Sequence, residues 1–255
     1  MDFLAVLSGF AVGAIVGMTG VGGGSLMTPL LIGAFKLHPA IAIGTDLWFA
    51  GITKSGGAWA HHRQGHVDRR VVALLLAGSL PAALATLAFM HFTGLGKSWF
   101  AGLSLALGIA LLLTAVTVAY RKAWSALGLA LERWLPPRRR DALTVVAGVS
   151  LGILVTLSSI GAGAIGATLI LLLYPRLPAQ RVVGTDIAHA VPLTLVAAIG
   201  HAWLGHVDWP LLAALLVGSL PGIWLGARLT RALPERLVRV LLCTSLVTAG
   251  IKVIA

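Results

Sequence analysis

The sequence contains one set of short motifs twice, at a constant separation of 140 positions. The motifs are Gly-Thr-Asp, a single His, Gly-His-Val-Asp and Gly-Ser-Leu-Pro. They begin at Gly44, His61, Gly65 and Gly78, and they return at Gly184, His201, Gly205 and Gly218. Twelve identities in one register without a gap indicate a duplicated unit. In a strongly apolar chain, such a duplication is typical of a transporter built from two related halves with its site between them.

Apolar stretches of membrane-spanning length recur along the chain. Hydrophobic residues make up 58% of its 255 residues and charged residues only 11%, whereas a soluble domain carries about a quarter charged residues. The stretches cover 3–20, 40–60, 71–92, 99–119, 142–160, 182–204, 210–228 and 236–254. Each approaches the length of about twenty helical residues that crosses the ~30 Å hydrocarbon core, and each is too long for a barrel strand. The sequence therefore predicts an all-α fold, a polytopic transmembrane helical bundle.

The repeat divides the chain into a first transmembrane repeat (1–119), a basic linker (120–141) and a second transmembrane repeat (142–255). Four large apolar residues of the linker recur at helical spacing and predict an amphipathic helix at the membrane surface. They are Trp124, Leu127, Leu131 and Trp134. A net charge of +11 would suggest nucleic acid in a soluble protein. Here the basic residues lie in short loops between apolar segments, so the expected partner is the lipid bilayer and not nucleic acid.

Each half opens with a segment longer than one span, 3–35 and 142–173, interrupted at 20–24 and 158–163. Such a segment either crosses once as paired half-helices or turns back as a re-entrant hairpin. If both segments turn back, the repeats are inverted and fifteen basic residues lie on one side against three on the other. If both cross once, the count is ten against eight. Because cytoplasmic loops carry the excess of Lys and Arg, we expect inverted-topology repeats in the cell (inner) membrane, with the linker cytoplasmic and both termini outside.

The glycine-rich breaks predict a binding site for an anion. Backbone that is not helical at membrane depth persists only where protein or water satisfies it. A half-helix N-terminus presents unpaired N–H groups and the positive end of the helix dipole. Two such breaks meeting near the midplane would hold an oxyanion, although close helix packing alone is the other interpretation of these glycines. The candidate substrate-binding residues of the breaks are Thr19, Gly22, Gly23, Gly24, Ser25, Ser158, Ser159, Gly161 and Gly163.

Four ionisable residues lie within or near the ends of the apolar segments, where an ionised group costs ~2.5–3.5 kcal/mol. Lys54 is either a counter-charge for a substrate anion or a neutralising partner of Asp46. Asp46 and Asp186 follow Gly-Thr and either cap their helices or handle protons or substrate. His189, one turn from Asp186, either relays protons or packs through a hydrogen bond. We assign Lys54 to substrate binding and the other three to proton coupling or gating.

Five histidines raise a metal-binding alternative. They are His61, His62, His66, His201 and His206. His62 and His66 have an i, i+4 spacing that suits a metal on a helix, but Gly65 interrupts the helix and no carboxylate or thiolate cluster completes the shell. We therefore expect no metal and no cofactor, and a histidine- and aspartate-based metal or cation carrier stays as the alternative function. An enzyme is not expected, because no base–nucleophile pair is tied to one site in the sequence.

With these residues in view, the chain resembles the TauE/SafE family of sulfite and organosulfonate exporters over essentially its whole length. The run Gly17–Gly24 followed by Pro29, the paired Gly-Thr-Asp and the Gly-Ser-Leu-Pro motif carry the resemblance. The second half departs from the family's triple glycine with Gly161-Ala162-Gly163-Ala164, which leaves its glycine site narrower.

The resemblance implies a plasma-membrane carrier of small sulfur oxyanions or sulfonates, usually outward, working as a secondary transporter by alternating access. A monoanion that leaves the negative cell interior gains ~2.3 kcal/mol per 100 mV, so export needs no ATP motif, and the sequence contains none. The sequence leaves open whether the protein is a homodimer.

Overall fold

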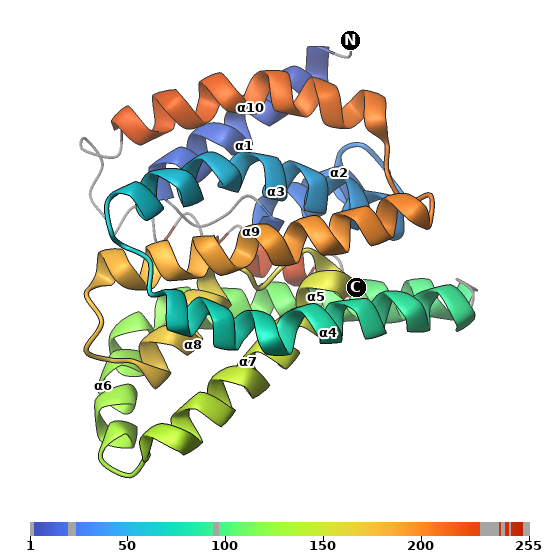
Figure 1. Ribbon diagram of the computed structural model, residues 1–255. Coiled ribbons are helices and arrows are strands. Elements are labelled where there is room, and N and C mark those ends of the chain that lie inside the picture. Colours follow the sequence, from blue (N-terminus) through green and yellow to red (C-terminus); the bar gives the residue numbers. More distant parts are fainter. Residues whose placement is uncertain are drawn as a thin grey trace.

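The computed structural model describes residues 3–19, 24–93, 97–229, 240, 243–244 and 246–251, and every regular element within them is an α-helix (Figure 1). The predicted all-α fold is therefore confirmed. The helices are α1 (Phe3–Thr19), α2 (Gly24–Gly33), α3 (Pro39–Arg63), α4 (Arg69–Thr93), α5 (Lys97–Ala119), α6 (Arg121–Glu132), α7 (Pro137–Ser158), α8 (Ala164–Leu173), α9 (Ala179–Trp203) and α10 (Trp209–Leu229). Of the last predicted span, 236–254, residues 240, 243–244 and 246–251 are helical, and the remaining positions lie outside the described residues.

Five of the described helices are long and apolar enough to cross a membrane. They are α4, α5, α7, α9 and α10. A helix of 25 residues, such as α4 or α9, is ~37 Å long at 1.5 Å per residue and exceeds the ~30 Å hydrocarbon core. Large apolar side chains such as Phe89, Val146 and Leu220 are exposed on the outer faces of these helices, where lipid covers them without cost. The chain is a multi-pass membrane protein.

Glycines bring helices of the two halves into close parallel pairs. A Cβ atom on Gly9 or Gly13 of α1 would fall on the backbone of Leu215 or Ser219 of α10. The same relation joins α7 to α4, where Gly148 and Gly152 lie against the backbone of Leu75 and Ser79. Figure 1 shows the α1–α10 pair on one side of the molecule and the α4–α7 pair on the other. The four-residue spacing of glycines thus serves close helix packing at these positions.

Helices α3 and α9 pack against each other between the two pairs (Figure 1). Gly44 near the start of α3 lies beside His201 near the end of α9, and Gly51 lies beside Leu195. Gly57, near the end of α3, faces Ile187. Residue numbers rise along one helix as they fall along the other, so α3 and α9 are antiparallel. The two helices carry the two copies of Gly-Thr-Asp, which brings equivalent residues of the halves together at the centre of the molecule.

The break in the second half turns the chain back on itself. Helix α7 ends at Ser158, and Ser159 takes a left-handed conformation with φ 60° while its N–H donates to the Val155 carbonyl at 2.7 Å. Gly161 and Gly163 follow with φ 123° and 141°, which only glycine adopts readily. After α8, the Tyr174 hydroxyl lies 2.9 Å from the Thr144 hydroxyl near the start of α7. Thus α7 and α8 form a hairpin whose second arm has 10 residues, about 15 Å or half the membrane core.

The first half has the same order of a long and a short helix. Helix α1 ends at Thr19 and α2 begins at Gly24 with the same 10-residue length as α8. The intervening residues 20–23, which include most of the predicted glycine break, lie outside the described residues.

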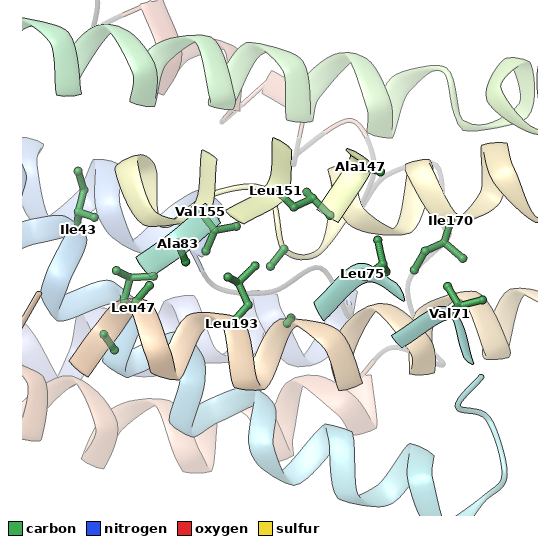
Figure 2. Close-up of a cluster of buried hydrophobic side chains, with 14 of the residues drawn as sticks. Ile43, Leu47, Val71, Leu75, Ala83, Ala147, Leu151, Val155, Ile170 and Leu193 are labelled. Atoms are coloured by element: carbon green, nitrogen blue, oxygen red, sulfur yellow. The ribbon is translucent and has the colours of Figure 1, made fainter. Parts of the chain in front are cut away.

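An apolar core surrounds the central helices and holds the α7–α8 hairpin in place. Figure 2 shows Leu151 and Val155 of α7 and Ile170 of α8 facing side chains of α3, α4 and α9. Leu47 and Leu193 are fully buried in this cluster. Because these contacts fix the hairpin against both halves, the broken backbone at 159–163 is held in one place and not at the lipid surface.

The linker contains helix α6, which lies against the end of the α7–α8 hairpin. Gly128 of α6 packs on the carbonyls of Leu171 and Leu172 at the C-terminus of α8. An ion pair of 2.9 Å joins Glu132 to Arg176 in the following loop. Since both groups of this pair reach solvent, it contributes less than about 1 kcal/mol, and the close contact at Gly128 is the main restraint.

Candidate functional site

The first two residues of each Gly-Thr-Asp motif bind a loop of the opposite half. Thr45 Oγ1 accepts a hydrogen bond of 3.0 Å from the Asp208 N–H, and Thr185 Oγ1 accepts one of 2.9 Å from the Asp68 N–H. Gly44 lies directly against the His206 carbonyl, where a side chain would not fit. Gly-Thr is therefore architectural, and each copy fastens the Gly-His-Val-Asp loop of the other half.

The aspartates of these loops cap the helices that follow. Asp68 Oδ1 accepts from the N–H groups of Arg70 and Val71 at the start of α4. Asp208 Oδ1 accepts from Leu211 N at 3.0 Å at the start of α10. Both are ordinary N-terminal caps, so these carboxylates are not available to a substrate.

The aspartates of the Gly-Thr-Asp motifs point the other way, into the protein. Asp46 is fully buried, and its Oδ2 accepts a hydrogen bond from Thr28 of α2. Asp186 is 3% exposed and lies against the first turn of α8, with Oδ1 beside Gly166. The Gly163 amide also faces the Asp186 carboxylate. Each aspartate therefore meets the short helix of its own half.

Lys54 of α3 is the buried basic residue near these carboxylates and is 8% exposed. Its ammonium donates a hydrogen bond of 2.6 Å to the Ala162 carbonyl in the α7–α8 break. It is within electrostatic reach of both Asp46 and Asp186, but neither carboxylate lies within the 4.0 Å of an ion pair. Lys54 is thus a buried cation that a backbone carbonyl holds, not a member of a closed salt bridge.

The broken backbone runs past all three ionisable side chains. Ser159 lies next to Asp46, Ala162 binds Lys54, and Gly163 faces Asp186. The two ends of the break come from α7 and α8, while the side chains come from α3 and α9. The site is therefore built from both halves of the chain.

His189 is buried on the same face of α9, and its Nε2 lies 2.9 Å from the hydroxyl of Ser79 on α4. This contact gives the histidine the hydrogen-bonded packing that the sequence left as one of two interpretations. Its other ring nitrogen, Nδ1, has no partner, so the contact with Ser79 leaves one position for a ligand or a proton.

Several buried polar atoms of the site lack hydrogen-bond partners. They are Asp46 Oδ1, Ser159 Oγ, Asp186 Oδ1 and His189 Nδ1. Buried polar groups are nearly always satisfied in folded proteins, and an unpaired one costs about 1–3 kcal/mol. The Ser159 hydroxyl and the Asp46 carboxylate lie next to each other, so the polar atoms that have neither a partner nor such a neighbour belong to Asp186 and His189, and both residues are within electrostatic reach of the Lys54 ammonium.

The structure places the candidate residues of the two glycine breaks in different environments. Gly22 and Gly23 lie outside the described residues, whereas Thr19 ends α1 and Gly24 and Ser25 begin α2. In the second break, the Ser158 hydroxyl donates to Leu154 O at 2.7 Å and accepts from Ile160 N at 3.2 Å. Its hydroxyl is engaged in the turn.

Ser159, Gly161 and Gly163 form the turn that faces the ionisable side chains. Three further contributors, Thr28, Ser79 and the Ala162 carbonyl, were not predicted. Ser79 lies in a repeated motif and Thr28 is polar within a short apolar helix, so both carried a signal, whereas a backbone carbonyl carries none.

The histidines pair with one another. His201 Nε2 lies 2.9 Å from the Thr156 carbonyl, and its Nδ1 lies 3.4 Å from His206 Nδ1. His61 and His66 form the equivalent ring contact in the first half, with centroids 5.6 Å apart. In the part of the chain that the structure describes, no three His, Cys, Asp or Glu residues gather in a metal-binding group.

Comparison with known proteins consistently finds membrane transporters. The sequence model of the family described as "Sulfite exporter TauE/SafE" matches residues 5–253. The chain is 37% identical to the "Probable membrane transporter protein YjnA" of Bacillus subtilis over all of both chains. It is 26% identical to YdhB of the same organism over 91% of each chain. A "Probable membrane transporter protein" of Xylella fastidiosa is 27% identical over 87% of this chain and 82% of its own. No solved structure matches.

Proposed function

Because this chain belongs to the sulfite exporter TauE/SafE family of membrane transporters, we propose that it is a secondary transporter that exports sulfite or small organosulfonates across the plasma membrane. The observation that carries this proposal is the buried Lys54 ammonium at the α7–α8 break. A buried ammonium attracts a small anion, and the Ser159 hydroxyl and the N–H groups at the start of α8 are donors that an oxyanion accepts.

We also propose that the halves are inverted repeats that give alternating access. The antiparallel pairing of α3 and α9 supports this, since equivalent helices that cross in opposite directions belong to halves of opposite topology. The excess of fifteen basic residues against three on the linker side supports the same arrangement. In the proposed arrangement the linker is cytoplasmic and both termini are outside.

The composition of the site fits this mechanism. Asp46 and Lys54 belong to the first half, while Ser159 and Asp186 belong to the second. A movement of one half against the other therefore opens the site to one side of the membrane and then to the other. The bound anion would leave through the side on which the halves separate.

Flux into proteoliposomes tests the proposal. Labelled sulfite, sulfoacetate and sulfate are offered to the wild type, to Lys54→Gln and to Lys54→Arg, with Lys36→Gln in the exposed α2–α3 loop as control. A hydrogen bond to a charged group is worth about 1.5–3 kcal/mol. We therefore expect Lys54→Gln to raise the half-saturating anion concentration by about 10- to 150-fold, Lys54→Arg to retain more activity, and Lys36→Gln to match the wild type.

Two results would count against the proposal. One is a wild type that moves none of the three anions. The other is a correctly folded Lys54→Gln variant, monodisperse in size-exclusion chromatography, that transports like Lys36→Gln.

A further inference from the structure

The Asp186 carboxylate occupies the place where the transported anion is expected to bind. Its Oδ1 lies against Gly166 in the first turn of α8, and the Gly163 amide faces it. The N-terminus of a helix attracts a negative charge through its unpaired N–H groups and its dipole. In this structure a side chain of the protein supplies that negative charge. An incoming anion and an ionised Asp186 therefore compete for one position.

The charges around Asp186 make this competition severe. Among the described residues, Lys54 of α3 is the charged group that faces Asp186, and the same ammonium is within electrostatic reach of Asp46 of α3 and His189 of α9. The single Lys54 ammonium is thus already the counter-charge of two buried carboxylates. A substrate anion added to this group would leave two negative charges without a counter-charge in an apolar bundle, where even one costs several kcal/mol.

Among the residues that the structure describes, the other helices packed against α9 contribute neutral groups to the site. Helix α4 contributes the neutral Ser79, and α7 and α8 contribute Ser159 and backbone. The nearest basic residue on α9 itself, Arg181, is directed to the loop residue Asp68 at 3.8 Å near the start of the helix.

One proton on Asp186 removes both obstacles. A neutral carboxyl group no longer competes for the Gly163 amide and the positive end of the α8 dipole. The total charge of the site also stays constant when a monoanion enters. The unpartnered Oδ1 of Asp186 is the atom that can receive the proton.

We propose that the ionised Asp186 side chain fills the anion site when no substrate is bound. It must take up a proton before the substrate binds, so that anion and proton cross the membrane together. This inference rests on the proposed function and adds the coupling ion to it. Export then runs down the outward gradient of the anion, because the accompanying proton cancels the charge of the monoanion and with it the gain from the membrane potential. Transport is electroneutral, with one proton for each monoanion. A metal cation is a poor substitute for the proton, because the Lys54 ammonium is already within electrostatic reach of both carboxylates.

Two driving forces distinguish this mechanism from simple anion movement. For an electroneutral proton–anion carrier, each unit of pH difference sustains about a tenfold anion gradient, and a membrane potential has no direct effect. For a carrier of the anion alone, the potential supplies ~2.3 kcal/mol per 100 mV and the pH difference supplies nothing.

The experiment measures sulfite accumulation in proteoliposomes under an imposed pH difference or an imposed potassium-diffusion potential. We expect the wild type to give about tenfold accumulation per pH unit, with matching proton entry reported by an internal pH dye. Asp186→Asn keeps the shape of the side chain and removes its charge. This variant should respond less than twofold to the pH difference and should respond to the potential instead. Asp141→Asn is the matched control, because Asp141 forms a surface ion pair with Arg70, and it should behave as the wild type.

A second measurement does not depend on flux. Infrared difference spectra of the purified protein with and without sulfite should show a gain of protonated carboxyl signal in the wild type and in Asp141→Asn, and none in Asp186→Asn. Sulfite flux that follows the potential and ignores the pH difference in the wild type overturns this inference and leaves the proposed function intact. An Asp186→Asn variant that keeps the full pH response overturns it in the same way. Absence of flux for every anion tested overturns both.

Discussion

The hydrogen bonds between Gly-Thr-Asp and the opposite loop provide a sharp test of how the halves are joined. Thr45→Val and Thr185→Val keep the side-chain shape and remove the acceptors of the bonds from Asp208 N and Asp68 N, which are 3.0 and 2.9 Å long. An unsatisfied buried N–H costs about 1–3 kcal/mol. Both loop aspartates are only half-buried, so water reaches them and the lower value, about 1 kcal/mol for each variant, is expected.

The two bonds lie at opposite ends of the α3–α9 pair, since Thr45 is near the start of α3 and Thr185 is near the start of the antiparallel α9. Separated sites without shared partners are additive. The double variant should therefore lose about 2 kcal/mol. In a chain of this size, 1 kcal/mol corresponds to about 2–4 °C in Tm, which gives about 4–8 °C for the double variant.

Thermal unfolding of the detergent-solubilised protein, followed by tryptophan fluorescence, measures these shifts. Thr194→Val is the matched control, because Thr194 is fully buried and its hydroxyl donates within α9, to the Ala190 carbonyl at 2.8 Å. If Thr45→Val and Thr185→Val melt no lower than Thr194→Val, these bonds do not hold the halves together and the reasoning fails.

Two further predictions concern packing and the histidine. Gly152→Ala places a methyl group on the backbone of Ser79 and should destabilise the protein by about 1–3 kcal/mol. Gly102→Ala, with open space around it, should stabilise the protein by about 0.5–1 kcal/mol. Equal shifts in melting temperature for the two variants would contradict the observed helix contact. Ser79→Ala removes the partner of His189 and should lower anion flux several-fold. Ser219→Ala should not lower the flux, because the Ser219 hydroxyl bonds within its own helix. Equal flux through the two variants, measured side by side, would show that Ser79 is not part of the site.

The sequence predicted the class of fold and singled out the ionisable residues that the structure brings together. Apolar runs of spanning length predicted the helices, and the glycine cluster at 158–163 predicted the end of α7. Lys54, Asp46 and Asp186 were singled out because charge is costly inside a membrane, and the structure brings all three to one break. The helices and the position of the break could be predicted because each depends on a local property of the chain, whereas the roles of Lys54, Asp46 and Asp186 stay a prediction.

The separate roles of the three residues in the repeated Gly-Thr-Asp motif could not be predicted from the sequence. The sequence left architecture and proton or substrate handling as alternatives for the motif, whereas the structure gives its residues different tasks. Gly44 and Thr45 bind a loop more than 160 positions away, and Asp46 turns inward to Thr28. Adjacent residues on a helix point in different directions, but which neighbour each one meets depends on the packing of distant segments.

By itself, the sequence determined that the chain is a bundle of membrane helices in two related halves with broken openings, because chain length, apolarity and glycine spacing act locally. Only the tertiary structure decided that the second opening turns back, that Lys54 binds the Ala162 carbonyl, and that Asp186 lies on the first turn of α8. These contacts join residues between about 20 and 110 positions apart. Their energies depend on how helices approach one another, and no local pattern in the chain encodes that approach.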